Sequence, residues 1–411
     1  MKKAAVIGAG VSGLTVAHVL EDRYAVKVFE KEDRPGGLVR CERIDGSLFH
    51  LCGGHVFNSK DEKVLDWFWS KFDREREFVK ATRNSSVCLE DGSFVAYPIE
   101  NHVYQLGADV QRRFVGDLLD MTVRPSAEPR NFDEFLRGRF GKTLYDLYFA
   151  PYNAKVWRRD LTEVPLSWLE GKLPMPTVRE MLEANIGRVE ERNFVHSTFW
   201  YERSGGSQFV ANRLAEGLDI VYGTDVGQID ALGDGRCRIG DEVFDLVVFC
   251  GNIKELPSVL KGVEWGRLAD EVSQFESHGT TAVFCELEAN PYSWVYQPGR
   301  RHASHRIICT GNFSPTNNAA GRLTGTVEFT DEIGKDEILA QLGQMPFHPR
   351  YITHHFSRYT YPIQKKDTRD VVAALKRKLR SLGVRLVGRF AEWEYFNMDA
   401  AMASALTCFN S

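Results

Sequence analysis

Residues 2–20 have the sequence KKAAVIGAGVSGLTVAHVL, and this stretch decides the fold. The apolar run over residues 4–7 is typical of a buried parallel strand. Gly8, Gly10 and Gly13 follow it with the spacing GxGxxG. The first glycine allows a tight turn, the second lets the backbone approach a pyrophosphate, and the third permits close packing of helix on strand. The stretch therefore predicts a strand, a glycine turn and a helix whose first N–H groups face a bound dinucleotide.

The segment after this unit indicates which dinucleotide the chain binds. A second predicted strand, AVKVFE, ends at Glu30, about 20 residues beyond the first glycine, where a carboxylate can bond the adenosine ribose. The loop EKEDRPGGLVR, residues 30–40, adds Arg34, Gly36 and Gly37 as a second place where the backbone can approach a ligand closely. This pattern resembles FAD enzymes with two dinucleotide-binding domains, amine oxidases among them, so we expect non-covalently bound FAD.

Another pair of adjacent glycines lies in HLCGGHVF, residues 50–57. Gly53 and Gly54 offer a backbone without side chains, which suits a position beneath a flat ring. His55 follows directly, and we expect it to face the flavin. A lone histidine is more often a core residue with satisfied hydrogen bonds, and that interpretation remains the alternative.

The bulk properties of the chain exclude several other classes of protein. Its 411 residues are 43% apolar and 26% charged, as in ordinary globular proteins, and a net charge of −4 favours neither nucleic acid nor an anionic membrane. We expect no membrane span and no signal peptide, because the apolar runs are short and residues 1–3 lead directly into the first strand. Eight cysteines occur singly, so we expect reduced thiols in a cytoplasmic protein.

The rest of the chain predicts an α/β multidomain fold, α+β in the broader sense. Helical spacing dominates residues 103–191, whereas alternating patterns dominate residues 280–360. We therefore expect a discontinuous Rossmann-like FAD-binding domain that carries a helical insertion and an antiparallel sheet domain. The expected boundaries are 1–75, 195–255 and 380–411 for the FAD-binding domain, 100–192 for the helical insertion with a substrate lid, and 76–99 with 265–375 for the antiparallel substrate domain.

Several later motifs together resemble one enzyme family. The chain contains, in this order, GGHVF, YPIENH, PYNAKVW, HRIICTGNFSP, YPIQ and GRFAEWEYFNMD. With them it resembles the UDP-galactopyranose mutase family nearly end to end. The resemblance implies a flavin-dependent isomerase that interconverts the pyranose and furanose forms of a UDP-sugar, UDP-galactose or a close relative. It also implies an adduct between N5 of reduced FAD and the sugar, with NADPH or NADH as the reductant.

The resemblance also implies roles for individual residues. Trp157 would lie beside the sugar and the flavin, and Tyr148 and Tyr152 would stack on the uracil. Such rings also occur as core residues of helices, and that alternative stays open. Asn397 stands where bacterial members carry an aspartate near the sugar. The remaining implied contacts are Asn153 for the substrate, Arg306, Tyr296, Tyr361 and Tyr395 for the diphosphate, and Arg389 and Met398 for FAD.

One position departs from the family pattern. The segment WLEGKLPMPT, residues 168–177, should carry a second phosphate arginine on a mobile loop, but the corresponding residue is Lys172. Lysine neutralises phosphate as a point charge and lacks the guanidinium fork. Arg158 or Arg179 could take that role, and Lys172 leaves the sugar and its leaving group open.

Two other functions remain alternatives at this point. The FAD motifs alone also fit an amine oxidase-like oxidoreductase, and Lys172 also fits a flavin-bound homologue that binds nucleotide sugars without turnover. The sequence does not choose between UDP and dTDP, or between a monomer and a homodimer, and it contains no metal-ligand spacing. We expect a nucleotide sugar as the partner, and no nucleic acid.

Overall fold

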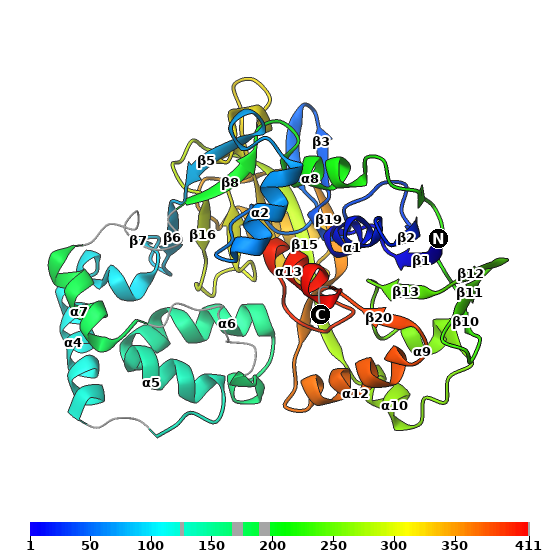
Figure 1. Cartoon of the computed structure of the whole chain (residues 1–411). Helices are drawn as coiled ribbons and strands as arrows, with labels where there is room; N and C mark the ends of the chain where they lie inside the picture. Colours follow the sequence, from blue (N-terminus) through cyan, green and yellow to red (C-terminus); the bar gives the residue numbers. More distant parts are fainter. Residues whose placement is uncertain (124–126, 167–175, 189–197, 410–411) are drawn as a thin grey trace.

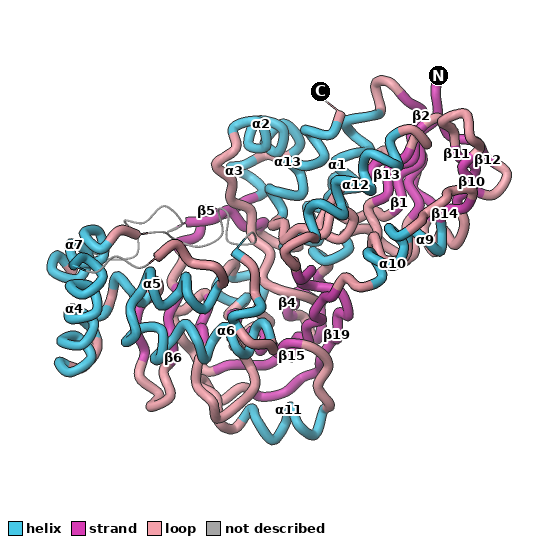
Figure 2. The backbone as a smooth tube through the Cα atoms, turned by 90° about the horizontal axis from the view of Figure 1, so that it is seen from below, coloured by secondary structure: helices cyan, strands magenta, loops and turns pink. Residues whose placement is uncertain are grey.

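The computed structural model describes residues 1–123, 127–166, 176–188 and 198–409 of the chain. Figure 1 shows an α/β domain on one side, a group of helices on the other side, and a large sheet between them. Figure 2, turned by 90°, shows the same division. The α/β multidomain fold expected from the sequence is confirmed.

A five-stranded parallel sheet forms the centre of the α/β domain. Its strand order is β20-β13-β1-β2-β9, and all neighbours run parallel. The strands are β1 (Lys2–Ile7), β2 (Tyr24–Phe29), β9 (Ile220–Val221), β13 (Leu246–Phe249) and β20 (Val384–Leu386). Because β2 and β9 are neighbours although far apart in sequence, the chain leaves this sheet and returns to it.

Helices cover both faces of the parallel sheet. On one face lie α1 (Val11–Leu20) and α13 (Met398–Cys408), which share a buried cluster with Val6 of β1. On the other face lies α12 (Thr368–Arg380), which shares a cluster with Ala5. Successive side chains of a strand point to opposite faces. Because helices cover both faces of this sheet, the side chains on both faces are buried, and the strand must be almost entirely apolar.

A seven-stranded sheet lies next to the α/β domain, in the order β19-β15-β18-β17-β16-β6-β7. Its strands are β6 (Ser85–Cys88), β7 (Phe94–Ala96), β15 (Glu276–Leu287), β16 (Trp294–Tyr296), β17 (Arg306–Ile308), β18 (Leu323–Thr330) and β19 (Arg350–Ile363). Neighbouring strands of this sheet run antiparallel, as predicted, except that β6 pairs with β16 in parallel. The exception arises because β6 enters from a separate chain segment and not through a hairpin.

The group of helices contains α4 (Ala108–Val123), α5 (Phe132–Leu144), α6 (Ala150–Trp157) and α7 (Val178–Gly187). Helix α5 is kinked at Gly141, whose φ is 78°, and from Leu144 the chain passes into α6 through a short π-helix, Tyr145–Phe149. A π-helical turn inserts extra residues into an otherwise α-helical path. The direction in which α6 presents its side chains therefore depends on this turn.

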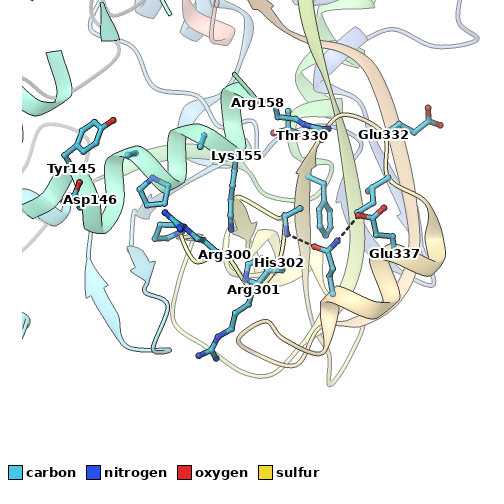
Figure 3. Close-up of a pocket in the computed structure, with 18 residues that line it drawn as sticks. Tyr145, Asp146, Lys155, Arg158, Arg300, Arg301, His302, Thr330, Glu332 and Glu337 are labelled. Carbon is cyan, nitrogen blue, oxygen red and sulfur yellow. Dashed lines mark hydrogen bonds between the residues drawn. The ribbon is translucent and has the colours of Figure 1, made fainter. Parts of the chain in front are cut away.

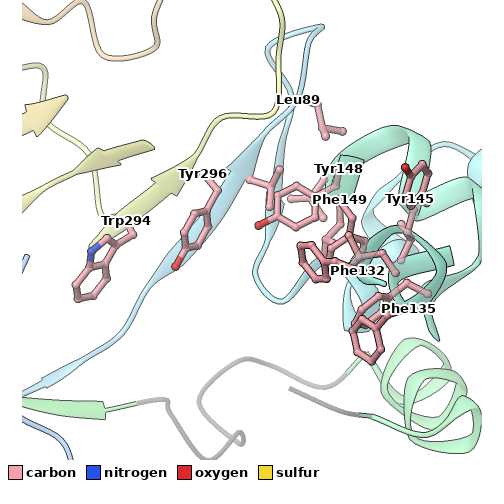
Figure 4. Packing of buried hydrophobic residues seen from close by; sticks show 14 of the residues in the cluster. Leu89, Phe132, Phe135, Tyr145, Tyr148, Phe149, Trp294 and Tyr296 are labelled. Carbon is pink, nitrogen blue, oxygen red and sulfur yellow. The ribbon is translucent and has the colours of Figure 1, made fainter. Parts of the chain in front are cut away.

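Aromatic side chains hold the helices against the large sheet, as Figure 4 shows. The Phe140 and Phe149 rings stack with 4.1 Å between their centroids. Tyr148 from the π-helical turn and Tyr296 from β16 belong to the same buried cluster. Because each ring buries a large apolar area, this contact fixes the helices relative to β16.

Smaller elements complete the fold. They are β3 (Cys41–Ile44), β4 (Ser47–His50), α2 (Glu62–Lys71), α3 (Arg74–Glu77), β5 (Phe78–Thr82), β8 (Thr198–Glu202), α8 (Gly206–Ala215), β10 (Ile229–Ala231), β11 (Cys237–Ile239), β12 (Glu242–Phe244), α9 (Leu256–Val259), β14 (Leu260–Lys261), α10 (Arg267–Ser273) and α11 (Lys335–Leu342). Within the described ranges, no helix has the length and apolar character to cross a membrane. All eight cysteines are free thiols, as predicted.

Replacement of Gly13 by alanine tests the packing of α1 on β1. A Cβ at Gly13 would lie 1.9 Å from the carbonyl oxygen of Gly8, so the glycine turn would have to open. We expect Gly13→Ala to lower the free energy of unfolding by about 1–3 kcal/mol, measured from urea unfolding curves.

Gly116→Ala is the matched control for this substitution. Gly116 lies in α4, and a Cβ there would meet nothing within 4 Å. We expect the free energy of unfolding of this variant to rise by roughly 0.5–1 kcal/mol, because alanine loses less backbone entropy than glycine when a helix forms. An unchanged unfolding midpoint in Gly13→Ala would contradict the proposed packing.

Candidate active site

One buried carboxylate supports the glycine turn. Gly8 has a φ of 101°, a conformation that favours glycine. Glu30, 6% exposed, accepts a hydrogen bond from the backbone N–H of Ala9 at 2.6 Å. Helix α1 then begins at Val11 with Gly10 as its N-cap, and no described side chain caps it. Its first N–H groups are therefore available to a phosphate group.

The second glycine loop meets the first one. The N–H of Gly36 donates to the carbonyl of Ala9 at 2.9 Å. A Cβ at Gly37 would lie 3.4 Å from Cα of Gly10, so the two backbones approach closely. The half-buried guanidinium of Arg34 makes no hydrogen bond or ion pair with any described residue. A cation without a protein partner beside two glycine loops fits the anionic backbone of a dinucleotide.

The loop with Gly53 and Gly54 is anchored to the large sheet. Gly53 has a φ of 68° and donates its N–H to Oε1 of Glu328 at 2.8 Å. A Cβ at Gly54 would lie 2.7 Å from Cγ2 of Ile308 on β17. The positive φ of Gly53 and the packing of Gly54 against the sheet therefore favour glycine at both positions, a role that the sequence did not reveal.

The His55 imidazole is neutral and has one nitrogen without a partner. Its Nε2 is buried and makes no hydrogen bond within the described part of the chain. Burial, together with the charges of His50 and Arg389, lowers the pKa of His55 to about 3. An orphaned ring nitrogen beside two glycines fits a flat heteroaromatic ligand such as a flavin, which can supply the missing hydrogen bond.

A buried ion pair lies at the centre of the site. Arg306 on β17 donates from Nε to the Glu328 carboxylate on β18, and from Nη2 to the Tyr361 hydroxyl at 3.1 Å. Glu328 is fully buried. Burial opposes its ionisation, but Arg306 and His305 hold the pKa of this carboxyl well below its usual range. Glu328 therefore stays ionised and fixes the direction of the Arg306 guanidinium.

Two stacked pairs of tyrosines neighbour Arg306. Tyr148 and Tyr152 stack at 5.4 Å between ring centroids, and Tyr361 and Tyr395 stack at 5.3 Å. Tyr296 packs edge-on against Tyr152 at 5.6 Å. Burial raises the pKa values of Tyr152 and Tyr361, so these hydroxyls stay neutral donors. The structure thus brings the predicted substrate tyrosines together.

Helix α6 supplies two further predicted residues. Trp157, 8% exposed, belongs to the same buried cluster as Tyr148 and Tyr296. The side-chain amide of Asn153 donates to the carbonyl of Phe149, one turn earlier, at 2.8 Å. In this arrangement Asn153 stabilises the junction between the π-helical turn and α6.

The start of α13 gathers the predicted C-terminal residues. Asn397 is the N-cap of α13, and Met398 is buried in the core beneath α1. Arg389 donates to the carbonyl of Phe396 at 2.8 Å, and its guanidinium lies 4.8 Å from the Tyr395 ring centroid. A cavity of about 550 Å³ opens here and is lined by Tyr395, Phe396 and Asn397, among others. Arg389 therefore holds the segment that leads into α13.

Two residues of this site were missed by sequence reasoning. Glu328 looks like an ordinary polar residue of the alternating strand GTVEFT. Arg83 precedes β6, and its Nη2 donates to the Tyr296 hydroxyl at 2.7 Å. Its guanidinium also lies 5.1 Å from the ring centroid of Trp294. The weak signal was a single charge, within an otherwise neutral strand for Glu328 and just before a strand for Arg83.

The cations that the sequence offered as phosphate partners lie elsewhere or cannot be placed. Lys172 falls outside the described residues. Arg158 contacts the carbonyl of Thr330 and the carboxylate of Asp331, both at 3.4 Å. Arg179 is 84% exposed and pairs with Glu183 on α7 at 3.7 Å. Neither arginine provides the second guanidinium that the family pattern would place beside Arg306.

Comparisons with known proteins match the N-terminal region to a family model and nearly the whole chain to individual relatives. A family model described as an NAD(P)-binding Rossmann-like domain matches residues 6–72. The chain is 35% identical over 417 residues to a UDP-galactopyranose mutase of Mycoplasma pneumoniae, with 98% of this chain and 94% of the relative covered. It is 23% identical over 419 residues to a dTDP-fucopyranose mutase of Escherichia coli, with coverage of 99% and 97%.

A solved structure shows the same fold. The crystal structure of a reduced UDP-galactopyranose mutase superimposes with a TM-score of 0.87 at 21% sequence identity. The superposition covers 99% of this chain and 93% of the other.

The substitution Glu328→Gln tests the buried ion pair. It leaves Arg306 without a counter-charge, so we expect it to cost about 3 kcal/mol or more of unfolding free energy at neutral pH. Because the folded-state pKa of Glu328 is depressed, its contribution is complete above the unfolded-state value of about 4.3 and declines as the pH falls below it. The difference in unfolding free energy between wild type and variant, measured from urea unfolding curves, should therefore become smaller below that pH.

Glu286→Gln serves as the control in the same sheet. Glu286 pairs with Arg350, whose side chain is 73% exposed, so this change should cost less than about 1 kcal/mol. A constant gap between Glu328→Gln and wild type at all pH values would contradict the ionised state of Glu328.

Proposed function

The chain belongs to the UDP-galactopyranose mutase family, and from this premise we propose that it interconverts the pyranose and furanose forms of a UDP-sugar. The observation that carries the proposal is the shared carboxylate of Glu328. It holds Arg306, a donor for a diphosphate, and Gly53, the start of the predicted flavin-facing loop. Phosphate donors and cofactor loop are thereby fixed relative to each other, as a reaction between the two ligands requires.

We assign FAD to the two glycine loops and to the loop of Gly53 and Gly54. The first N–H groups of α1 would hold the diphosphate of the cofactor together with Arg34, which has no partner among the described residues. The neutral His55 imidazole would bond the flavin through Nε2. When bound and reduced, with NADPH or NADH as the proposed reductant, the flavin supplies the nucleophile for the anomeric carbon of the sugar.

The substrate diphosphate is assigned to Arg306 and the surrounding hydroxyls. Arg306 supplies a charge whose direction Glu328 fixes, Tyr361 supplies a neutral donor beside it, and Tyr395 stacks on Tyr361. Arg83, which bonds the Tyr296 hydroxyl, is our candidate for the second cation of this site. The stacked Tyr148 and Tyr152 rings offer an aromatic surface for the base.

These residues act on the charge that develops during ring contraction. The bond from the anomeric carbon to the diphosphate breaks and later forms again, without net oxidation or reduction. Arg306 and the tyrosine hydroxyls stabilise the departing diphosphate and keep it in place for its return. Trp157, almost fully buried, excludes water from the sugar.

We propose UDP-galactose as the first substrate to test, because the relative with 35% identity is a UDP-galactopyranose mutase. A dTDP-sugar is the second choice, since another relative is a dTDP-fucopyranose mutase. We propose that Asn397 contributes a discriminating contact to the sugar.

The activity is tested with UDP-galactofuranose under anaerobic conditions, with and without dithionite. We expect conversion to UDP-galactopyranose, separated by chromatography, only with the reduced holoenzyme. Hydrogen peroxide formation from amines, without any conversion of UDP- or dTDP-sugars, would contradict the proposal and support an amine oxidase.

The substitution Tyr361→Phe tests the diphosphate assignment. Removing the hydroxyl that Arg306 bonds at 3.1 Å should lower kcat/KM by roughly tenfold, the equivalent of one hydrogen bond to a charged group. Tyr351→Phe is the control on the same strand, because its hydroxyl bonds His354 instead. Equal losses in the two variants would argue against a role of Tyr361 at the substrate.

A further inference from the structure

A second cavity lies on the side of α6 that faces away from the clustered tyrosines. Its volume is about 1160 Å³, and Pro151, Lys155 and Arg158 line it with a spacing of about one helical turn. The other walls come from the loop 297–305 between β16 and β17, and from the region around α11. Within the described part of the chain, neither Tyr152 nor Trp157 lines this cavity.

Lys155 reaches across the cavity without meeting an opposite charge, as Figure 3 shows. Its Nζ donates to the carbonyls of Gln297 and Ser304, both at 2.8 Å. No described carboxylate lies within ion-pair distance of this ammonium group, and its third N–H is left over. Burial lowers the pKa of Lys155 to about 8, although the nearby Glu90 carboxylate favours its charged form.

The loop opposite α6 adds a second cation and an unpaired nitrogen. The guanidinium of Arg300 makes no hydrogen bond or ion pair with a described residue, whereas Arg301 pairs with Glu90 at 3.3 Å and extends away from the cavity in Figure 3. Nδ1 of His302 is buried and has no described partner. Burial lowers the pKa of His302 to about 4, so the ring is neutral and can present an N–H.

No carboxylate that lines the cavity makes an ion pair with Lys155 or Arg300 among the described residues. Asp146 pairs with Lys142. Glu337 accepts a hydrogen bond from Gln341 at 3.2 Å. Glu332 is exposed and points away from Lys155 in Figure 3. The Glu90 carboxylate accepts from the backbone N–H of Arg300 and pairs with Arg301. The side chains of Lys155 and Arg300 therefore keep their charges without a carboxylate partner among the described residues.

We propose that this cavity is a second anion site, which binds the phosphoryl group of a small molecule between Lys155, Arg300 and His302. A compact ammonium and a guanidinium fork are the pair of groups that suits phosphate oxygens. The cavity is larger than a phosphoryl group needs, and Ala150, Pro151 and Ala154 give it an apolar wall for the rest of the ligand. The site is separate from the diphosphate donors around Arg306, and it does not depend on the proposed reaction.

Inorganic pyrophosphate is the probe for this site, and isothermal titration calorimetry on the holoenzyme is the measurement. We expect Arg300→Glu to remove a pyrophosphate binding event of the wild type or to weaken it at least tenfold. Arg301→Glu makes the same charge change at the neighbouring position. We expect this variant to bind pyrophosphate with a Kd within about threefold of the wild-type value. The two side chains are solvent-accessible, and unchanged thermal unfolding midpoints verify that both variants fold.

Three results would overturn the proposal. Pyrophosphate could fail to bind to the wild type, it could bind to Arg300→Glu as it does to the wild type, or it could lose equal affinity in both variants. The last result would reduce the effect to general surface charge. Binding to the donors around Arg306 would remain in both variants and is therefore distinguished from binding in this cavity.

Discussion

The charge on Glu328 must be balanced inside the protein, and this requirement organises the site. A fully buried carboxylate is stable only when cations and hydrogen-bond donors surround it. Here Arg306 supplies the cation, and the backbone N–H of Gly53 supplies a donor from a different domain. A strand of the large sheet and a loop of the dinucleotide-binding region are thus held together by one side chain. The same contact leaves the other donors of Arg306 directed toward Tyr361 and the space beside it.

The sequence predicted the dinucleotide unit well because its determinants are local. The glycine turn, Glu30 and the strand and helix on either side lie within one short segment, and each residue type has one dominant physical reason there. The tyrosines, by contrast, come from the π-helical turn, α6, β16, β19 and the segment before α13. Motif resemblance identified them, but periodicity could not show that they meet. Glu328 and Arg83 escaped notice because a single charge on or before a strand normally indicates a solvent-facing position.

The basic and aromatic stretch of residues 150–161 illustrates the same limit. The sequence analysis placed Tyr152 and Trp157 at the substrate and offered Arg158 as a phosphate partner. In the structure the helical period separates them, with Tyr152 and Trp157 among the buried aromatics and Lys155 and Arg158 along the outer cavity. Arg158 then contacts Asp331 instead of joining Arg306. The number of cations in a segment therefore says less about a ligand site than the side of the helix on which each of them lies.

The π-helical turn Tyr145–Phe149 constrains how this protein can change in evolution. Deletion of a single residue there would rotate α6 by about 100° relative to α5. The rotation would carry Tyr152 out of the tyrosine cluster and put Asn153 in its angular position, while the residues that line the outer cavity would turn further from the cluster. Substitutions within the turn leave the orientation of α6 relative to α5 unchanged, whereas insertions or deletions alter it. Among homologues, the length of this segment should therefore vary less than its composition.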